Sequence, residues 1–159
     1  MLFRSEGKGF KVAMQTLDGG RVGVAAIALG LEEGAIAEAV KYTKERVQFN
    51  KRLSQFQNTQ FQLADMQTKT DAAQMLVYRA AAAKDAHDPD LGLYSSMAKL
   101  FASENASDVT RRVVQLFGGY GYTREYPVER MMRDAKITEI YEGTSEVQRM
   151  VISSHMGVK

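Results

Sequence analysis

Hydrophobic residues recur every three or four positions over long stretches of this sequence, which is the spacing of a helical face and not of a strand. The first stretch runs from about residue 21 to residue 46, after the turn-like Asp18-Gly19-Gly20. Its core-facing positions are Val22, Ala26, Leu29, Ile36 and Val40. Proline occurs only at Pro89 and Pro127, so little interrupts the pattern. The sequence predicts an all-α fold.

Two more long helices are expected, over about residues 58–86 and 90–117, with a tight connection marked by Pro89. The second helix has two apolar stripes, which predicts a central helix buried by several neighbours. One stripe comprises Phe61, Ala64, Thr68, Ala72, Met75 and Leu76, and the other Leu63, Met66, Ala73 and Ala80. The inner face of the third helix comprises Leu93, Met97, Leu100, Phe101, Val109, Val113, Leu116 and Phe117, with Glu104 and Asn105 as interruptions.

Two shorter helices are expected near the C-terminus. Residues 125–134 read as a short helix started by Pro127, and a last helix begins near Thr144, where Ser145 and Gln148 have capping-box spacing. Short connections favour antiparallel neighbours, so the prediction is an up-and-down four-helix bundle with a short extra helix before the last one. Residues 1–17 are expected to connect to a missing upstream part, and residues 18–159 to form the bundle domain.

Composition and charge exclude several partners. The 21 basic and 19 acidic residues are interspersed, so no basic stripe indicates nucleic acid. The absence of cysteine excludes disulfides and thiolate metal sites, and His87 and His155 lie far apart, so no metal is expected. The longest apolar run, residues 22–31, is too short for a membrane span. No targeting segment is visible, and a bacterial cytoplasm is preferred to a mitochondrial matrix.

The best candidate for chemistry is Glu142, which precedes Gly143 just before the last helix. A carboxylate at the end of an irregular segment, beside a residue that lets the backbone approach a ligand, suits a general base. The competing interpretation is a partner for the helix dipole, and spacing alone favours it.

Three further groups each allow two interpretations. Arg46, Lys51 and Arg52 lie on an expected loop that either holds an anionic phosphate or is a solvated turn, the commoner case. The glycines at 118, 119 and 121 resemble a phosphate loop, but a helix C-cap with a tight turn is favoured. The glycines at 23, 30 and 34 weaken the first helix, and close packing is preferred to ligand contact as the compensation.

The order and wording of several motifs carry more information than any one of them. Together they resemble the C-terminal helical domain of the acyl-CoA dehydrogenases, most closely the short-chain (butyryl-CoA) type, over about residue 7 to the C-terminus. The motifs are Asp18-Gly19-Gly20-Arg21, Glu45-Arg46 followed by Phe49, Gln57, Gln115-Leu116-Phe117-Gly118-Gly119, Tyr126-Pro127-Val128-Glu129, Met132-Arg133-Asp134-Ala135-Lys136-Ile137 and Ile140-Tyr141-Glu142-Gly143-Thr144.

This resemblance implies FAD-dependent α,β-dehydrogenation of a short-chain acyl-CoA. Glu142 would remove the α-proton while a hydride leaves to flavin N5, and electrons would pass to an electron-transferring flavoprotein. The implied substrate-side residues are Asp18, Arg21, Tyr141 and Gly143. Those implied to contact FAD held mainly by a neighbouring subunit are Arg46, Gln48, Phe49, Gln57, Gln115 and Gly119, and those implied to contact the subunit's own FAD are Thr144 and Glu146. Gln48 stands where family members often have Thr.

Sharing of FAD between subunits implies a homodimer or a dimer of dimers. Family members also have an N-terminal helical domain and a middle β-domain, which are not in these 159 residues. Two other readings therefore stay open: a non-catalytic helical bundle or oligomerisation module, and a flavoprotein of the acyl-CoA oxidase type with oxygen as acceptor.

Overall fold

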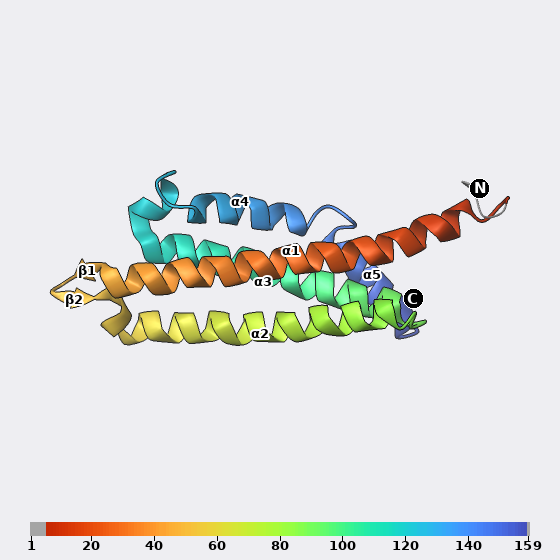
Figure 1. Cartoon of the computed structure of the whole chain (residues 1–159), viewed down its shortest axis with the longest axis horizontal. Helices are drawn as coiled ribbons and strands as arrows, with labels where there is room; N and C mark the ends of the chain where they lie inside the picture. Colours follow the sequence, from red (N-terminus) through yellow and green to blue (C-terminus); the bar gives the residue numbers. More distant parts are fainter. Residues whose placement is uncertain (1–5, 159) are drawn as a thin grey trace.

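Three long antiparallel helices form the body of the molecule in a computed structural model that describes residues 6–158 (Figure 1). They are α1 (Gly9–Glu45), α2 (Gln57–Asp85) and α3 (Leu91–Phe117). The shorter α4 (Val128–Thr138) packs along α3 and α1, and α5 (Ser145–His155) contacts α3. The predicted all-α bundle is confirmed. The short helix α4, which the sequence predicted as an addition to the bundle, packs alongside α1 and α3.

Short irregular elements join the helices. A two-stranded antiparallel hairpin, β1 (Val47–Gln48) and β2 (Lys51–Arg52), follows α1, and the 3₁₀ turn η1 (Leu53–Gln55) leads into α2. Phe49 and Asn50 form the turn of the hairpin, with φ angles of 53° and 61°, which are the left-handed values of a tight hairpin turn. A second 3₁₀ turn, η2 (Gly118–Tyr122), follows α3.

The central helix is α3, which contacts α1, α2, α4 and α5. The expectation that the second helix is central is wrong, because α2 packs on α1 and α3 and leaves its outer face in solvent. Phe61 and Met75, from the first expected stripe, are each 59% exposed. Met66 and Ala73, from the second stripe, are fully buried. Only one of the two apolar stripes is therefore a core face.

Alanine dominates the seam between α1, α2 and α3. Small side chains let helix backbones approach closely, so long helices pack without large residues between them. The buried alanines of this seam are Ala25, Ala28, Ala73, Ala80, Ala98, Ala102 and Ala106. A second cluster toward the hairpin end holds larger side chains, with Tyr42 stacked on Phe117 at 4.0 Å between ring centroids.

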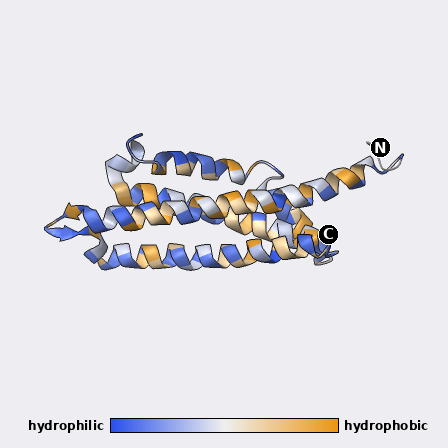
Figure 2. Cartoon of the chain, viewed as in Figure 1, coloured by the Kyte–Doolittle hydropathy of each residue, from blue (hydrophilic) through white to orange (hydrophobic). Residues whose placement is uncertain are grey.

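The first helix begins earlier than predicted. It starts at Gly9 and passes through Gly19 and Gly20 without a break, so the predicted start at Arg21 is wrong. Its first turns extend beyond the bundle and carry exposed apolar residues such as Phe10, 80% exposed (Figures 1 and 2). The assignment of residues 1–17 as a connecting segment stays a prediction, and residues 1–5 lie outside the described residues.

The last helix is capped by Thr144, whose Oγ1 accepts a long hydrogen bond of 3.5 Å from the Val147 N–H. The predicted capping box of Ser145 and Gln148 is therefore wrong by one residue. The Gln148 side chain is buried and donates instead to the Gly143 carbonyl oxygen at 2.8 Å. None of the helices within residues 6–158 combines the length and hydropathy of a membrane span.

Candidate functional sites

Glu142 lies on a tight turn between α4 and α5, and two successive residues of this turn have left-handed backbone conformations. The φ angle is 55° at Glu142 and 96° at Gly143. A left-handed conformation is common for glycine but uncommon and strained for glutamate. Such a backbone persists only where its surroundings fix it. The geometry thus agrees with a specially presented side chain rather than an ordinary residue before a helix.

Two buried side chains fix this turn through one carbonyl oxygen. The oxygen of Gly143 accepts hydrogen bonds from Lys99 Nζ at 2.7 Å and from Gln148 Nε2 at 2.8 Å. Gln148 Nε2 also lies 3.3 Å from the Glu142 carbonyl oxygen. Both donors are fully buried. Lys99 was not predicted from the sequence, because a lysine on a helix is normally solvated. The one indication was that its position lies among residues that α3 buries.

The carboxylate of Glu142 lies against the backbone of α1 at Gly20. A Cβ atom at residue 20 would stand 2.7 Å from Glu142 Oε2 and 3.0 Å from its carboxyl carbon. Glycine is therefore required for the carboxylate to occupy this position. Among the described residues, Glu142 Oε2 is buried and has no hydrogen-bond partner. The carboxylate is oriented by the fold and keeps one oxygen free.

The other residues expected on the substrate side lie near Glu142 in sequence or on α1. Arg21 Nη1 donates to Asp18 Oδ1 at 2.9 Å and lies 3.5 Å from Ser96 Oγ. Arg21 is buried, whereas Asp18 lines an open groove of about 900 Å³ formed with the α2–α3 connection. Tyr141, beside Glu142, is 37% exposed. The substrate roles of these residues stay predictions.

The glycines that pack closely against other parts of the chain are not the ones expected from the sequence. Nothing comes within 4 Å of a Cβ atom placed at Gly23 or Gly30, and Gly34 meets only the Met131 side chain at 3.5 Å. At Gly121, by contrast, a Cβ would lie 2.6 Å from the Val114 carbonyl oxygen. Gly118, with φ of 62°, caps α3, which confirms the C-cap interpretation of this glycine cluster.

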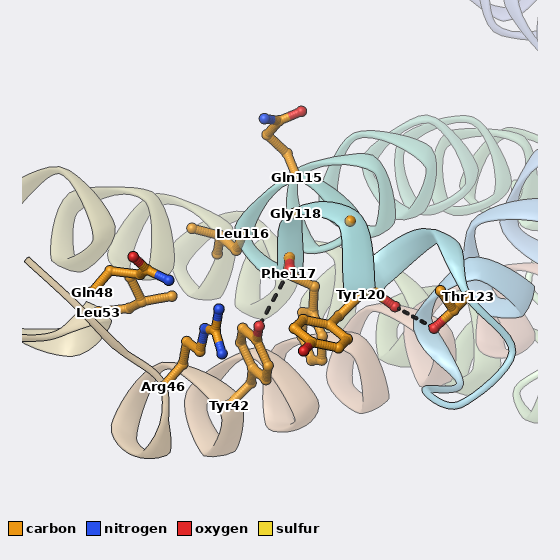
Figure 3. A pocket seen from close by; sticks show the side chains of 11 residues that line it. Tyr42, Arg46, Gln48, Leu53, Gln115, Leu116, Phe117, Gly118, Tyr120 and Thr123 are labelled. Carbon is orange, nitrogen blue, oxygen red and sulfur yellow. Dashed lines mark hydrogen bonds between the residues drawn. The ribbon is translucent and has the colours of Figure 1, made fainter.

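A second candidate site is an open groove of about 470 Å³ at the hairpin end of the bundle (Figure 3). Arg46 lies beside it, with its guanidinium carbon 5.3 Å from the centre of the Tyr120 ring. Within residues 6–158, Arg46 forms no salt bridge. Gln48, Gln115 and Gly119 also line the groove, although the Gln115 side chain points away from Arg46 (Figure 3).

The remaining residues expected to contact FAD are dispersed. Phe49 is 87% exposed at the hairpin tip, and Gln57 is exposed at the start of α2. Thr144 and Glu146 lie at the start of α5, on the same turn as Glu142. Lys51 and Arg52, the other members of the predicted cationic cluster, are exposed on the hairpin. Of these three cations, only Arg46 lines the groove.

The two candidate sites lie far apart. Gly20, which contacts the Glu142 carboxylate, and Glu45, beside Arg46, are both on α1, and a helix rise of 1.5 Å per residue separates them by about 38 Å. Within residues 6–158, one site offers a carboxylate oxygen without a hydrogen-bond partner and the other a guanidinium without a salt bridge. No group of three metal-ligating side chains occurs within residues 6–158.

These features define a helical bundle domain with two candidate sites, a positioned carboxylate and a groove lined by Arg46. Residues 7–157 match the family described as acyl-CoA dehydrogenase, C-terminal domain. Since the match covers nearly the whole chain, the protein belongs to this family.

Individual relatives agree with this assignment. The chain is 60% identical to the short-chain specific acyl-CoA dehydrogenase of Clostridium acetobutylicum, over 93% of this chain and 39% of the relative. It is 56% identical to acryloyl-CoA reductase (NADH) of Anaerotignum propionicum, over 96% and 38%. The structure of butyryl-CoA dehydrogenase from Megasphaera elsdenii superposes with a TM-score of 0.93 at 57% identity, over 96% of this chain and 39% of that one. The chain spans about two fifths of these relatives.

Proposed function

We propose that this chain is the C-terminal domain of a flavin-dependent acyl-CoA dehydrogenase for short-chain substrates, with Glu142 as the base that removes the α-proton. Family membership and the short-chain specific relatives support this proposal. The observation that carries it is the Glu142 carboxylate, which a left-handed turn holds against Gly20 with Oε2 unpartnered among the described residues. The activity is proposed for a protein in which the chain is joined to parts equivalent to the rest of its relatives.

The proton transfer makes specific demands that the Glu142 region meets. An α-C–H beside a thioester is a weak acid, so the base must be held at a fixed point and its carboxylate must not be neutralised by an ion pair. Glu142 forms no salt bridge within residues 6–158. Its turn is fixed by Gln148 and Lys99 through backbone oxygens, which leaves the carboxylate itself available.

FAD is the cofactor that the family implies, and the residues at the hairpin end fit such a group. A dinucleotide carries a pyrophosphate and an aromatic ring system. Arg46, which forms no salt bridge within residues 6–158, offers a guanidinium for the phosphates, and Gly119 offers a close backbone approach. Arg46, Gln48, Gln115 and Gly119 would hold one FAD, and Thr144 and Glu146 another. When bound, FAD supplies the hydride acceptor.

This division supports a homo-oligomer. The two sets of proposed FAD contacts lie about 38 Å apart along α1, one beside the turn that meets Gly20 and the other at the C-terminal end of the helix. One flavin next to Glu142 is therefore out of reach of Arg46 in the same chain. A symmetric assembly in which Arg46 of one subunit meets the FAD of another accounts for both sets. A homodimer or dimer of dimers stays our prediction.

The direction of the reaction has a second candidate. The relative named acryloyl-CoA reductase (NADH) is 56% identical to this chain. Because catalysis is microscopically reversible, a carboxylate that removes the α-proton in dehydrogenation delivers it in reduction. The same Glu142 therefore serves either direction. Electron-transferring flavoprotein as the acceptor and a bacterial cytoplasmic location both stay predictions.

The test is a chimera that carries this chain in place of the C-terminal domain of the Megasphaera elsdenii butyryl-CoA dehydrogenase. We expect it to bind FAD and to be reduced by butyryl-CoA without oxygen. Glu142→Gln should abolish flavin reduction and leave FAD bound, because an amide keeps the shape but accepts no proton. Asp134→Asn, at an exposed position on α4, is the matched control and should react normally.

Other outcomes select the rival readings. Near-normal reduction in Glu142→Gln removes this residue from the base role. A folded chimera without FAD favours a non-catalytic bundle. Rapid peroxide formation by the reduced flavin in air favours an oxidase, and NADH-driven reduction of acryloyl-CoA favours the reductase direction.

A further inference from the structure

We propose that Lys99 is the positioning residue of the Glu142 turn: its buried ammonium group holds the Gly143 carbonyl oxygen and thereby keeps the Glu142 carboxylate against Gly20. The inference rests on the proposed function of Glu142. It assigns to α3, the central helix, a direct part in orienting the base. Lys99 would act through the backbone and not by contact with the reacting atoms.

The geometry of this contact is that of a built site. Lys99 is fully buried on α3, and its Nζ lies 2.7 Å from the oxygen of Gly143, 44 residues further along the chain. A charge-assisted hydrogen bond of this length is among the stronger ones in proteins. It clamps the residue next to Glu142, where the backbone turns through two successive left-handed conformations.

Satisfying the Gly143 carbonyl does not require Lys99. Gln148 Nε2 already donates to the same oxygen at 2.8 Å. A buried ammonium group is costly to desolvate, and a well-packed apolar side chain of similar size is often no worse for stability. If the role of residue 99 were purely structural, a methionine at this position together with Gln148 would fill it. The lysine adds a second, charged clamp.

Burial and charges of both signs act on the Lys99 ammonium group. Burial lowers the pKa of Lys99, and nearby Arg21 on α1 acts in the same direction. The acids Glu139, Glu104 and Glu142 oppose this effect. These acids come from the end of α4, from α3 and from the turn itself. The hydrogen bond itself ties the turn to α3.

The kinetic test uses Lys99→Met in the chimera. We expect kcat for flavin reduction to fall by about 10- to 100-fold, because a displacement of the base by about 1 Å has effects of this size. KM and FAD content should stay within about twofold, since binding energy in general depends on other contacts. Asn105→Leu is the matched control: it removes a buried polar side chain on the same helix that contacts Glu32. It should alter stability without lowering kcat.

A rescue experiment in the isolated chain separates positioning from packing. The chain contains no cysteine, so Lys99→Cys can be alkylated in the unfolded state at one thiol and then refolded. Reaction with 2-bromoethylamine restores an ammonium group at the length of lysine, and 1-iodopropane gives an uncharged side chain of the same length. We expect amide hydrogen exchange at residues 143–145 to be slow in the aminoethyl form and at least tenfold faster in the propyl form.

Each result decides the inference. Wild-type kcat in Lys99→Met, or equal exchange in the two alkylated forms, overturns it. If Lys99→Met does not fold in the chimera, the alkylated pair still gives the answer. Retained activity in Glu142→Gln would instead overturn the proposed function, whereas an inactive Glu142→Gln with a fully active Lys99→Met overturns the positioning role alone.

Discussion

Glu32 and Glu142 are two glutamates that the bundle treats in opposite ways. Glu32 lies on the regular part of α1, is fully buried, and accepts hydrogen bonds at Oε2 from Thr70 Oγ1 at 2.8 Å and Asn105 Nδ2 at 2.5 Å. Glu142 lies on a strained left-handed turn at the end of the bundle and is half-buried. Its Oε2 has no partner among the described residues. Within residues 6–158, Glu32 Oε1 is likewise buried without a partner, so the two acids differ in backbone conformation and in the donors that hold the second oxygen of Glu32.

A perturbed pKa does not by itself mark a functional position. Burial raises the pKa of Glu32 to about 7, against weaker opposing effects of its hydrogen bonds to Thr70 and Asn105. Such a shift is typical of catalytic acids, but buried structural groups have it too. Glu32 is enclosed by α1, α2 and α3, with donors that hold one of its oxygens. The left-handed backbone of Glu142 and the close contact of its carboxylate with Gly20 are what distinguish it from Glu32.

The largest effect that we expect concerns stability at Glu32. The pKa of this acid is about 7 when folded, above its ordinary value of 4.5, so between these pH values only the unfolded chain loses the proton. The contribution of Glu32 to stability should therefore be fully present below pH 4.5 and decrease by about 3 kcal/mol as pH rises to 7, at 1.36 kcal/mol per pKa unit. Urea unfolding of the isolated chain at several pH values measures this change.

The matched pair for this measurement is Glu32→Gln and Glu33→Gln. The first variant removes the titrating group, so most of the decrease in stability between pH 4.5 and 7 should disappear. The second changes the exposed neighbouring acid and should preserve it. Flavin reduction in the chimera should persist in Glu32→Gln and be lost in Glu142→Gln. Loss of the reaction in Glu32→Gln would contradict the division between the two acids.

The next effect is a displacement of Glu142 by a single methyl group. In Gly20→Ala the new Cβ would lie 2.7 Å from Glu142 Oε2, so the carboxylate must move. We expect flavin reduction by the chimera to slow by about 100-fold. Gly23→Ala, on the same helix with nothing within 4 Å, is the control; it should react normally and gain about 1 kcal/mol of stability from helix propensity. Equal rates in the two variants would show that Glu142 is not held by Gly20.

Local sequence signals predicted the helices where patterning and packing agree. The bounds of α2 and α3 differ from their predicted ranges by about one residue, because Pro89 and the glycines after Phe117 end the pattern sharply. The start of α1 was missed by about twelve residues. Gly19 and Gly20 read as a turn, but the space above them is filled by Lys84 and Glu142, side chains that lie far away in sequence. No local signal contains that information.

Of the candidate site, only the residues that belong to sequence motifs were predictable from the sequence. Glu142 and Gly143 stand out because a carboxylate and a glycine precede a helix, and the resemblance to a family raises them further. Lys99 and Glu32 were missed because charged residues are normally solvated. Both occupy the apolar seam of a long helix, where a charged residue at a core position is the signal to follow. The roles assigned to Glu142 and the FAD contacts stay predictions.

The smallest effect that we expect comes from a similar comparison of two arginines, one paired with an acid and one that faces a groove. Arg21 is paired with Asp18, whereas Arg46 forms no salt bridge within residues 6–158 and faces the open groove. If the guanidinium meets the FAD of a neighbouring subunit, Arg46→Met should raise the FAD dissociation constant of the assembled chimera by about tenfold, since a hydrogen bond to a charged group contributes about 1.5–3 kcal/mol. Arg52→Met, on the exposed hairpin next to the groove, is the control. FAD retained after gel filtration measures both, and an equal loss in the two variants would mean that general positive charge and not the position of Arg46 attracts the cofactor.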